Sequence, residues 1–150
     1  TCGITVKLHS VVSTKNRTVL ACELRSILEA VHAAGGAIHS WKFYQYMSYD
    51  VPDIDQAHTV TPEAYAAFCV QAQQALADTN IKLHFKDNQE MNDSLFNILS
   101  YGNAQYMMAG DTWSTSRRTE DLRKYASMQE LFARNDIDEA RFNQFHALQI

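Results

Sequence analysis

The chain has 150 residues, long enough for one domain that buries roughly two thirds of its unfolded surface. Hydrophobic residues make up 46% and charged residues 20%, which is typical of a soluble globular protein. The net charge of −4 argues against a nucleic-acid-binding protein, which needs a surplus of Lys and Arg. No apolar run approaches the ~20 residues of a membrane span, and no signal-peptide pattern opens the chain. We therefore expect a cytoplasmic protein with neither nucleic-acid nor membrane partners.

The first half of the chain alternates between expected strands and helices. Alternating apolar and polar side chains, typical of strands with one apolar face, occur at 4–9, 38–44 and 81–88. Helical periodicity covers residues 18–34, which end at a Gly-Gly pair, and 61–80, which begin with Thr-Pro-Glu. Residues 50–60 are expected to form an acidic loop. Strands separated by helices predict βαβ units and therefore a parallel sheet.

The second half follows a different pattern. Two β-prone runs, 94–101 and 104–108, flank Gly102-Asn103 and predict a β-hairpin with a type II′ turn, although one irregular helix is an alternative. From Thr119 onward, an apolar stripe predicts a helix, and a second short helix is expected from Asp136. The whole chain is thus predicted to be a single α/β domain, 1–150, with a helical C-terminal extension at 113–150.

The three expected parallel strands place basic side chains on one face. Parallel sheets are usually apolar on both faces, so such a face in an acidic protein predicts a cavity that holds an anion. A solubilising role on an exposed sheet face is the alternative. Aromatic Tyr44 and Tyr46 interleave with the basic residues on the second strand, which favours the cavity. The polar face carries Lys7, His9, Lys42, Lys82, His84, Lys86 and Asn88.

The spacing of the Cys and His residues gives little support for a metal site or for a reactive thiol. Cys2, Cys22 and Cys69 form no CxxC pair, and the last two are expected to be core thiols. His9 and His84 could form a metal site with Asp87 or Asp93, but no tight His spacing supports one, so no metal is predicted. No serine lies on a Gly-x-Ser-x-Gly elbow, which argues against a hydrolase.

Three motifs resemble, in order and spacing, the last strands of radical-SAM barrels of the viperin type. They are Lys7-Leu8-His9-Ser10-Val11-Val12, Trp41-Lys42-Phe43-Tyr44-Gln45 and Asn88-Gln89-Glu90-Met91-Asn92-Asp93-Ser94, within residues 4–110. The resemblance implies a partial parallel β/α barrel of three βα units, followed by a hairpin. It also implies that Lys7 and Lys42 point into the barrel lumen, where the family's lysines hold a nucleotide triphosphate.

The chain departs from this family at several positions. His9 stands where the family has asparagine, and Ser40 where it has the arginine before Trp-Lys. The three closely spaced cysteines that hold the iron–sulfur cluster are absent, as is a Gly-Gly-Glu-like strand for SAM. The resemblance therefore implies a non-catalytic half-barrel without a cofactor.

These observations predict binding of a phosphorylated small molecule, such as a nucleotide, on the basic strand face. Lysine ammonium groups suit phosphate, because they neutralise it as point charges on flexible stems. The open sheet edges also predict a homodimer. Alternatives are a protein-interaction module whose lysines pair with acids at 50–55, and a complementing subunit of a split radical-SAM enzyme. The predicted contacts are Lys7, Lys42 and Lys86, with His9, Tyr44, His84 and Asn88 shaping the pocket.

Overall fold

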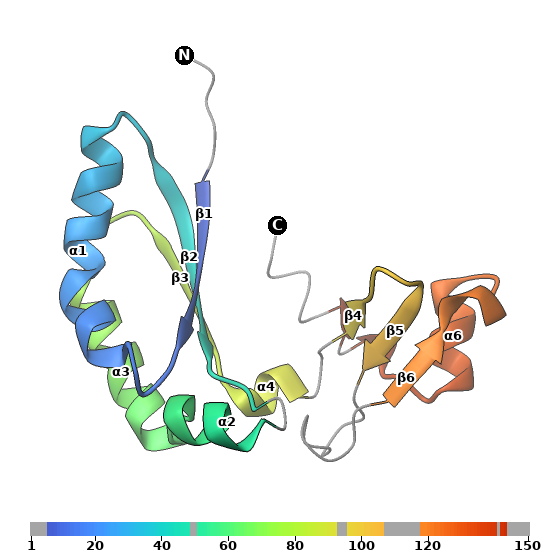
Figure 1. Cartoon of the computed structure of the whole chain (residues 1–150). Helices are drawn as coiled ribbons and strands as arrows, with labels where there is room; N and C mark the ends of the chain where they lie inside the picture. The colour runs from blue at the N-terminus through green and yellow to red at the C-terminus, as the bar shows by residue number, and fades with distance from the viewer. Residues whose placement is uncertain (1–5, 49–50, 93–95, 107–117, 141, 144–150) are drawn as a thin grey trace. The chain divides into compact units, whose positions relative to one another are not determined.

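A computed structural model describes the chain over residues 6–48, 51–92, 96–106, 118–140 and 142–143 (Figure 1). The chain forms two compact units, Thr1–Asn88 and Gln89–Ile150. The sequence predicts an internal boundary between residues 110 and 113, a segment that lies outside the described residues. A single domain spanning 1–150 stays a prediction.

The first unit is built on a parallel sheet with the strand order β1-β2-β3. Its strands and helices follow one another as the alternating pattern predicts, and both strand pairings are parallel. In chain order the elements are β1 (Val6–Val12), α1 (Arg17–Ala33), β2 (Ile38–Gln45), α2 (Pro52–His58), α3 (Pro62–Ala75) and β3 (Lys82–Lys86).

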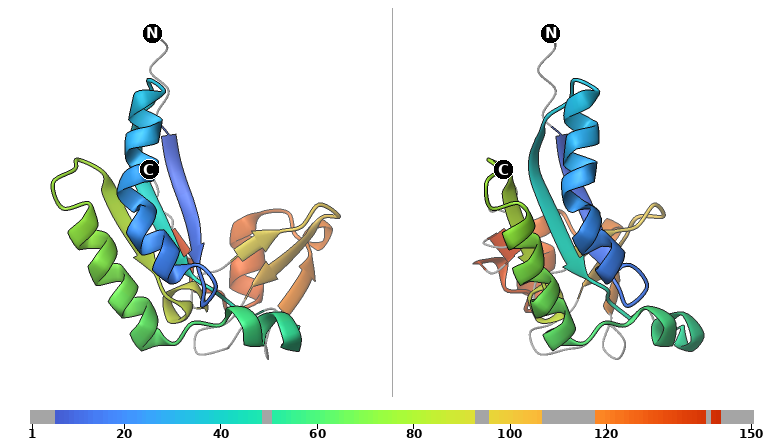
Figure 2. Two further views of the ribbon diagram at one scale, coloured as in Figure 1. Left: turned by 60° about the vertical axis from the view of Figure 1, so that its left-hand side comes forward. Right: turned by 90° about the vertical axis from the view of Figure 1, so that its left-hand side faces the viewer.

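The helices α1 and α3 lie on the same face of this sheet (Figures 1 and 2). That face is the apolar one, where Trp41 and Phe43 of β2 stack with their ring centroids 5.2 Å apart. Phe43 also meets Phe68 of α3 edge-on and stacks on Phe85 of β3. Leu24 and Leu28 of α1 complete the core. The core therefore lies on one side of the sheet, and the alternation of each strand sends the basic side chains to the other side.

Local signals in the sequence explain where α1 ends and where α3 begins. α1 ends at Ala33, and two residues later Gly35 has a φ of +78°, a conformation that glycine adopts without strain. The Gly36 N–H donates to the Val31 carbonyl oxygen, and the Gly35 N–H donates to that of His32, as in a Schellman motif. α3 begins with the Thr61 hydroxyl accepting a hydrogen bond from the Ala64 N–H. The predicted helices are confirmed, although α3 ends earlier than residue 80.

The expectation of a loop over residues 50–60 is wrong, because residues 52–58 form α2. Pro52 lies in the first turn, where a backbone N–H would have no partner within the helix, so the missing N–H of proline costs nothing. The negative charges of Asp53 and Asp55 are stabilised by the positive end of the helix dipole. The carboxylate of Asp55 also accepts hydrogen bonds from the Tyr46 hydroxyl at 2.9 Å and the Ser48 hydroxyl at 2.8 Å. The acidic character of this segment thus supports a helix rather than a loop.

The second unit contains an antiparallel sheet with the order β4-β5-β6. β4 and β5 form the predicted hairpin, within the residues that the structure describes. The turn spans Leu99–Gly102 and is longer than the predicted type II′ turn, with Gly102 at a φ of +85°. The remaining elements are α4 (Asn88–Asn92), β4 (Phe96–Ile98), β5 (Asn103–Tyr106), β6 (Arg118–Asp121), the 3₁₀ turn η1 (Leu122–Lys124) and α6 (Met128–Arg134).

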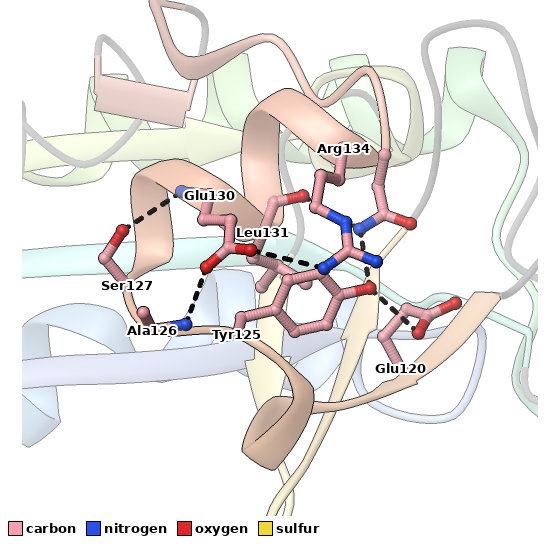
Figure 3. Close-up of polar contacts among 8 residues, drawn as sticks. Glu120, Tyr125, Ala126, Ser127, Glu130, Leu131 and Arg134 are labelled. Carbon is pink, nitrogen blue, oxygen red and sulfur yellow. Dashed lines mark hydrogen bonds and ion pairs between the residues drawn. The ribbon is translucent and has the colours of Figure 1, made fainter.

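The helix predicted from Thr119 is wrong in its first part, because residues 118–121 form β6 and pair with β5. The helix α6 starts only at Met128, after a capping box. In this box the Ser127 hydroxyl accepts from the Glu130 N–H, and the Glu130 carboxylate accepts from the Ala126 N–H (Figure 3). Further on, helical residues occur at 139–140 and 142–143 rather than from Asp136, whose φ is +53°.

A small aromatic core holds the second unit together. Leu131 and Phe132 of α6 are buried with Ala104 of β5. Phe96 and Phe142 each meet Phe132 edge-on, with ring centroids 5.6 and 5.1 Å apart. The unit therefore has its own core, separate from that of the parallel sheet.

The predicted fold class is confirmed in its coarser form, a mixed α/β protein with a three-stranded parallel sheet and an antiparallel sheet. The described strands of the first unit form an open sheet in which β1 and β3 are the outer strands. None of the helices in the described part of the chain combines the length and apolar character needed to span a bilayer.

Candidate functional site

The register of the parallel sheet sets three rows of side chains across the face opposite α1 and α3. We call this surface the basic face. Strand geometry places neighbours about 4.8 Å apart across the strands and about 6.7 Å apart along them, so the rows cover a patch of about 10 by 13 Å. From the amino to the carboxyl ends of the strands, the rows are Lys7–Ser40–Lys82, His9–Lys42–His84 and Val11–Tyr44–Lys86.

Lys42 occupies the centre of the basic face. It lies on the middle strand with His9 on one side and His84 on the other, and only 6% of its surface is exposed. Its Nζ lies 5.9 Å from the centre of the Tyr44 ring, within the range of a cation–π contact. Burial lowers the pKa of Lys42, and the charges of Lys86 and Lys7 lower it further. The ammonium group is therefore held where like charges surround it.

Both histidines of the middle row are also affected by the lysines. Partial desolvation, Lys42 and Lys7 lower the pKa of His9, whose ring centroid lies 5.7 Å from that of Tyr44. Partial burial and Lys42 lower the pKa of His84, with smaller effects from the other three lysines of the face. Both rings are therefore predominantly neutral at neutral pH, and each offers one N–H donor and one acceptor nitrogen.

Lys86, at the carboxyl end of the face, is fixed from the opposite side of the sheet. Its backbone N–H donates to the hydroxyl of Tyr65 at 3.0 Å, and that hydroxyl donates to the carbonyl oxygen of Phe43 at 2.8 Å. Tyr65 belongs to α3 and is 4% exposed. Burial raises the pKa of Tyr65, so its hydroxyl keeps the proton that it donates. One buried hydroxyl thus links the helix layer to two strands of the site.

Asn88 lies just beyond the end of β3. Its backbone N–H donates to Gln45 Oε1 at 3.0 Å, and its side-chain Nδ2 donates to the Tyr46 carbonyl oxygen at 3.1 Å. Gln45 in turn donates to the carbonyl oxygen of Val60. The Oδ1 of Asn88 is buried and accepts no hydrogen bond from the described residues. The two N–H donors of Asn88 therefore join the carboxyl end of β3 to that of β2.

The structure brings six of the seven predicted contact residues onto one face, and Asn88 follows at the end of a strand. Ser40 and Lys82 share the face but were not among the predicted contacts, although the same alternation places them there. The supporting roles of Tyr65 and Gln45 have no signal in the sequence, because their partners are distant along the chain.

Metal-ligating and thiol groups do not gather on the described part of this face. Among the described residues, no group of three His, Cys, Asp or Glu side chains could hold a metal ion. Asp93, one of the two acids considered as a ligand, lies outside the described residues. The prediction that Cys22 is a core thiol is wrong: Cys22 is exposed, because it lies about 200° around α1 from buried Leu24. Cys69 is half-buried, and burial raises its pKa.

A separate cavity of about 760 Å³ lies at the amino ends of β2 and β3 and contains none of the predicted contacts. Its wall includes the ion pair between Arg25 of α1 and Asp78, together with His32 and His39. Ligands of open α/β sheets bind at the carboxyl ends of the strands, so we assign this cavity no ligand.

No family model, curated protein or solved structure matches the chain. The radical-SAM-like half-barrel therefore stays a prediction.

Proposed function

We propose that the chain binds a phosphorylated small molecule, such as a nucleotide, on its basic face and does not itself catalyse a reaction. Lys7, Lys42 and Lys86 would contact the phosphate groups, while His9, Tyr44 and the other predicted residues would shape the pocket. The observation that carries the proposal is the environment of Lys42. This side chain is almost fully buried and lies among other lysines.

Placing like charges together raises the free energy of the folded chain. A structural role for Lys42 would be served better by an apolar side chain, since its pKa is lowered both by burial and by its neighbours. Residues that lower stability in this way are typical of binding and catalytic sites. An anion over the face would make the local interaction of Lys42 favourable, because its ammonium would then face a negative charge.

The strand order supports a barrel-like origin of this site. Successive parallel strands lie side by side in chain order, with both connecting helices on one face, as in one part of a β/α barrel. We propose that the first unit is such a partial barrel. Two outer strands then remain at its edges, and a second copy of the chain could cover them. A homodimer is therefore part of the proposal.

The test is calorimetric and thermal-shift titration of the full chain with ATP and with inorganic tripolyphosphate. A ligand at ~100 times its dissociation constant adds about 2.7 kcal/mol of stability, which moves the unfolding midpoint upward by several degrees. We expect Lys42→Met to abolish the shift, because the substitution keeps most of the length of the side chain and removes the charge. Lys124→Met, which removes an exposed lysine from the second unit, is the matched control and should leave the shift unchanged.

The same variants separate binding from assembly. If neither polyphosphate shifts the midpoint of the wild-type chain, the proposed function is wrong. If Lys42→Met instead changes the mass measured by sedimentation, the basic face is a protein interface. Binding that requires a second chain carrying cluster cysteines would favour the complementing subunit of a split enzyme.

A further inference from the structure

The middle row of the basic face places two titratable rings beside one lysine. His9 pairs in register with Lys42 on one side, and His84 pairs with Lys42 on the other. Neighbouring strands are about 4.8 Å apart, so an anion in contact with the Lys42 ammonium lies within reach of both imidazoles. A charged ligand at the centre of the face must therefore change the pKa of both rings.

All the charges that act on these rings from the described strands are positive. His9 faces Lys42 across the sheet and Lys7 along its own strand. His84 faces Lys42 across the sheet and Lys82 and Lys86 along its own strand, with Lys7 further away. Tyr44, the remaining titratable neighbour, keeps its proton, because burial raises its pKa. The free site thus opposes protonation of both histidines.

We propose that binding of an anion on the basic face is coupled to protonation of His9 and His84, and that the coupling selects dianionic groups such as terminal phosphate monoesters over monoanionic diesters. This inference rests on the proposed function. Each imidazole takes one proton from solvent and becomes an imidazolium, in which both nitrogens are N–H donors, so the nitrogen that faces the anion donates to it. The site therefore adds positive charge only when a ligand supplies negative charge.

The direction of the pH dependence follows from linkage. A bound dianion stabilises the imidazolium and raises the pKa of both rings above their values in the free chain. Affinity is then greatest below the free-chain pKa values and falls as the pH rises through those of the complex. A dianion about 5 Å from one unit charge gains roughly a tenfold affinity even at the dielectric constant of water. Two such rings give a clear change between a pH of about 5.5 and a pH of about 8.

Phosphate monoesters are poor probes of this coupling, because they titrate themselves near pH 6. Inorganic sulfate stays a dianion and methyl sulfate a monoanion throughout this range, so they form a matched pair of probes. We would follow the ring protons of all histidines of the full chain by NMR against pH, with sodium chloride of equal ionic strength as the reference. Substitution of each histidine by Gln assigns the signals.

We expect sulfate to raise the pKa of His9 and His84, methyl sulfate to raise it less, and His32 on α1 to be unaffected in the same spectra. Sulfate affinity should be at least tenfold higher at pH 5.5 than at pH 8. The double variant His9→Gln, His84→Gln should lose this pH dependence, whereas His32→Gln should keep it.

Two negative results have different meanings. If sulfate perturbs the backbone amides of the basic face but leaves both histidine titrations unchanged, the coupling is wrong and anion binding stands. If neither sulfate nor the polyphosphates perturb these amides at any pH, the proposed function and the coupling are both overturned. Equal effects of sulfate and methyl sulfate would overturn the selection of dianions.

Discussion

Removal of the Tyr65 hydroxyl tests whether the helix layer holds the strands of the site in place. In Tyr65→Phe the ring still fills its place in the core, and only the oxygen is lost. That oxygen accepts from the Lys86 N–H at 3.0 Å and donates to the Phe43 carbonyl at 2.8 Å, and both hydrogen bonds are buried. The substitution therefore removes two hydrogen bonds without creating a large cavity.

The size of the effect follows from the groups left behind. A buried backbone group without a partner costs about 1–3 kcal/mol. The Lys86 N–H and the Phe43 carbonyl oxygen are the two backbone groups that lose this partner. We expect the free energy of unfolding to fall by about 2 kcal/mol, and the midpoint of thermal unfolding by roughly 6 °C.

Urea unfolding of the full chain, followed by the fluorescence of buried Trp41 in a Trp113→Phe background, measures this difference. Tyr101→Phe removes the same atom from a tyrosine that is 64% exposed, and should change the free energy of unfolding by less than about 0.5 kcal/mol. If Tyr65→Phe is as mild as Tyr101→Phe, the two hydrogen bonds do not stabilise the sheet and the reasoning fails. Because the same hydroxyl fixes the backbone of Lys86, Tyr65→Phe should also weaken anion binding.

Three further substitutions test other parts of the structure. Lys42→Met should raise the free energy of unfolding of the unliganded chain at neutral pH. Because the pKa of Lys42 is lowered in the fold, this gain should shrink as the pH approaches the ordinary pKa of lysine, and a gain that does not change with pH in urea titrations would contradict this explanation. Gly35→Ala should lower the free energy of unfolding by about 1 kcal/mol, because residue 35 has a positive φ, and Gly35→Asn should lower it less. If thermal unfolding finds Gly35→Ala as stable as the wild-type chain, backbone strain at this position is excluded. Ser127→Ala should destabilise α6 by about 1 kcal/mol in hydrogen exchange, while Ser26→Ala, within α1, should have little effect.

The sequence predicts the parallel sheet well because the alternation of side chains along a strand is a local property. Once Trp41 and Phe43 face the core, Lys42 must face the other way, and the same holds on both neighbouring strands. The register that aligns His9, Lys42 and His84 in one row is not local. It depends on how α1 and α3 pack against the sheet, so the sequence could place these residues on one face but not in one row.

The errors have equally physical causes. The strand β6 is short and polar, and it forms by pairing with β5, where Glu120 lies opposite Ala104. The side chains of residues 118–121 show no periodicity that would predict this pairing. The loop expected at 50–60 is wrong because acidic residues also favour the first turn of a helix, and α2 begins there with Pro52. The hydrogen bonds of Tyr65 and Asn88 join segments far apart in the chain, and such contacts leave no pattern in a single sequence.

The strand order has a consequence for how the protein forms. The three strands of the basic face, which carry His9, Lys42 and His84, are separated by whole helices. Each parallel pairing must therefore close a long loop, and the entropy of closure is lost before the strand contacts form. The hairpin of β4 and β5 closes only a short turn and can form early. During synthesis the basic face is incomplete until β3 has left the ribosome, so His84 and Lys86 are the last of its residues to join. We expect the parallel sheet to be the slow step of folding, and a polyanion that binds the completed face to slow unfolding more than it speeds folding.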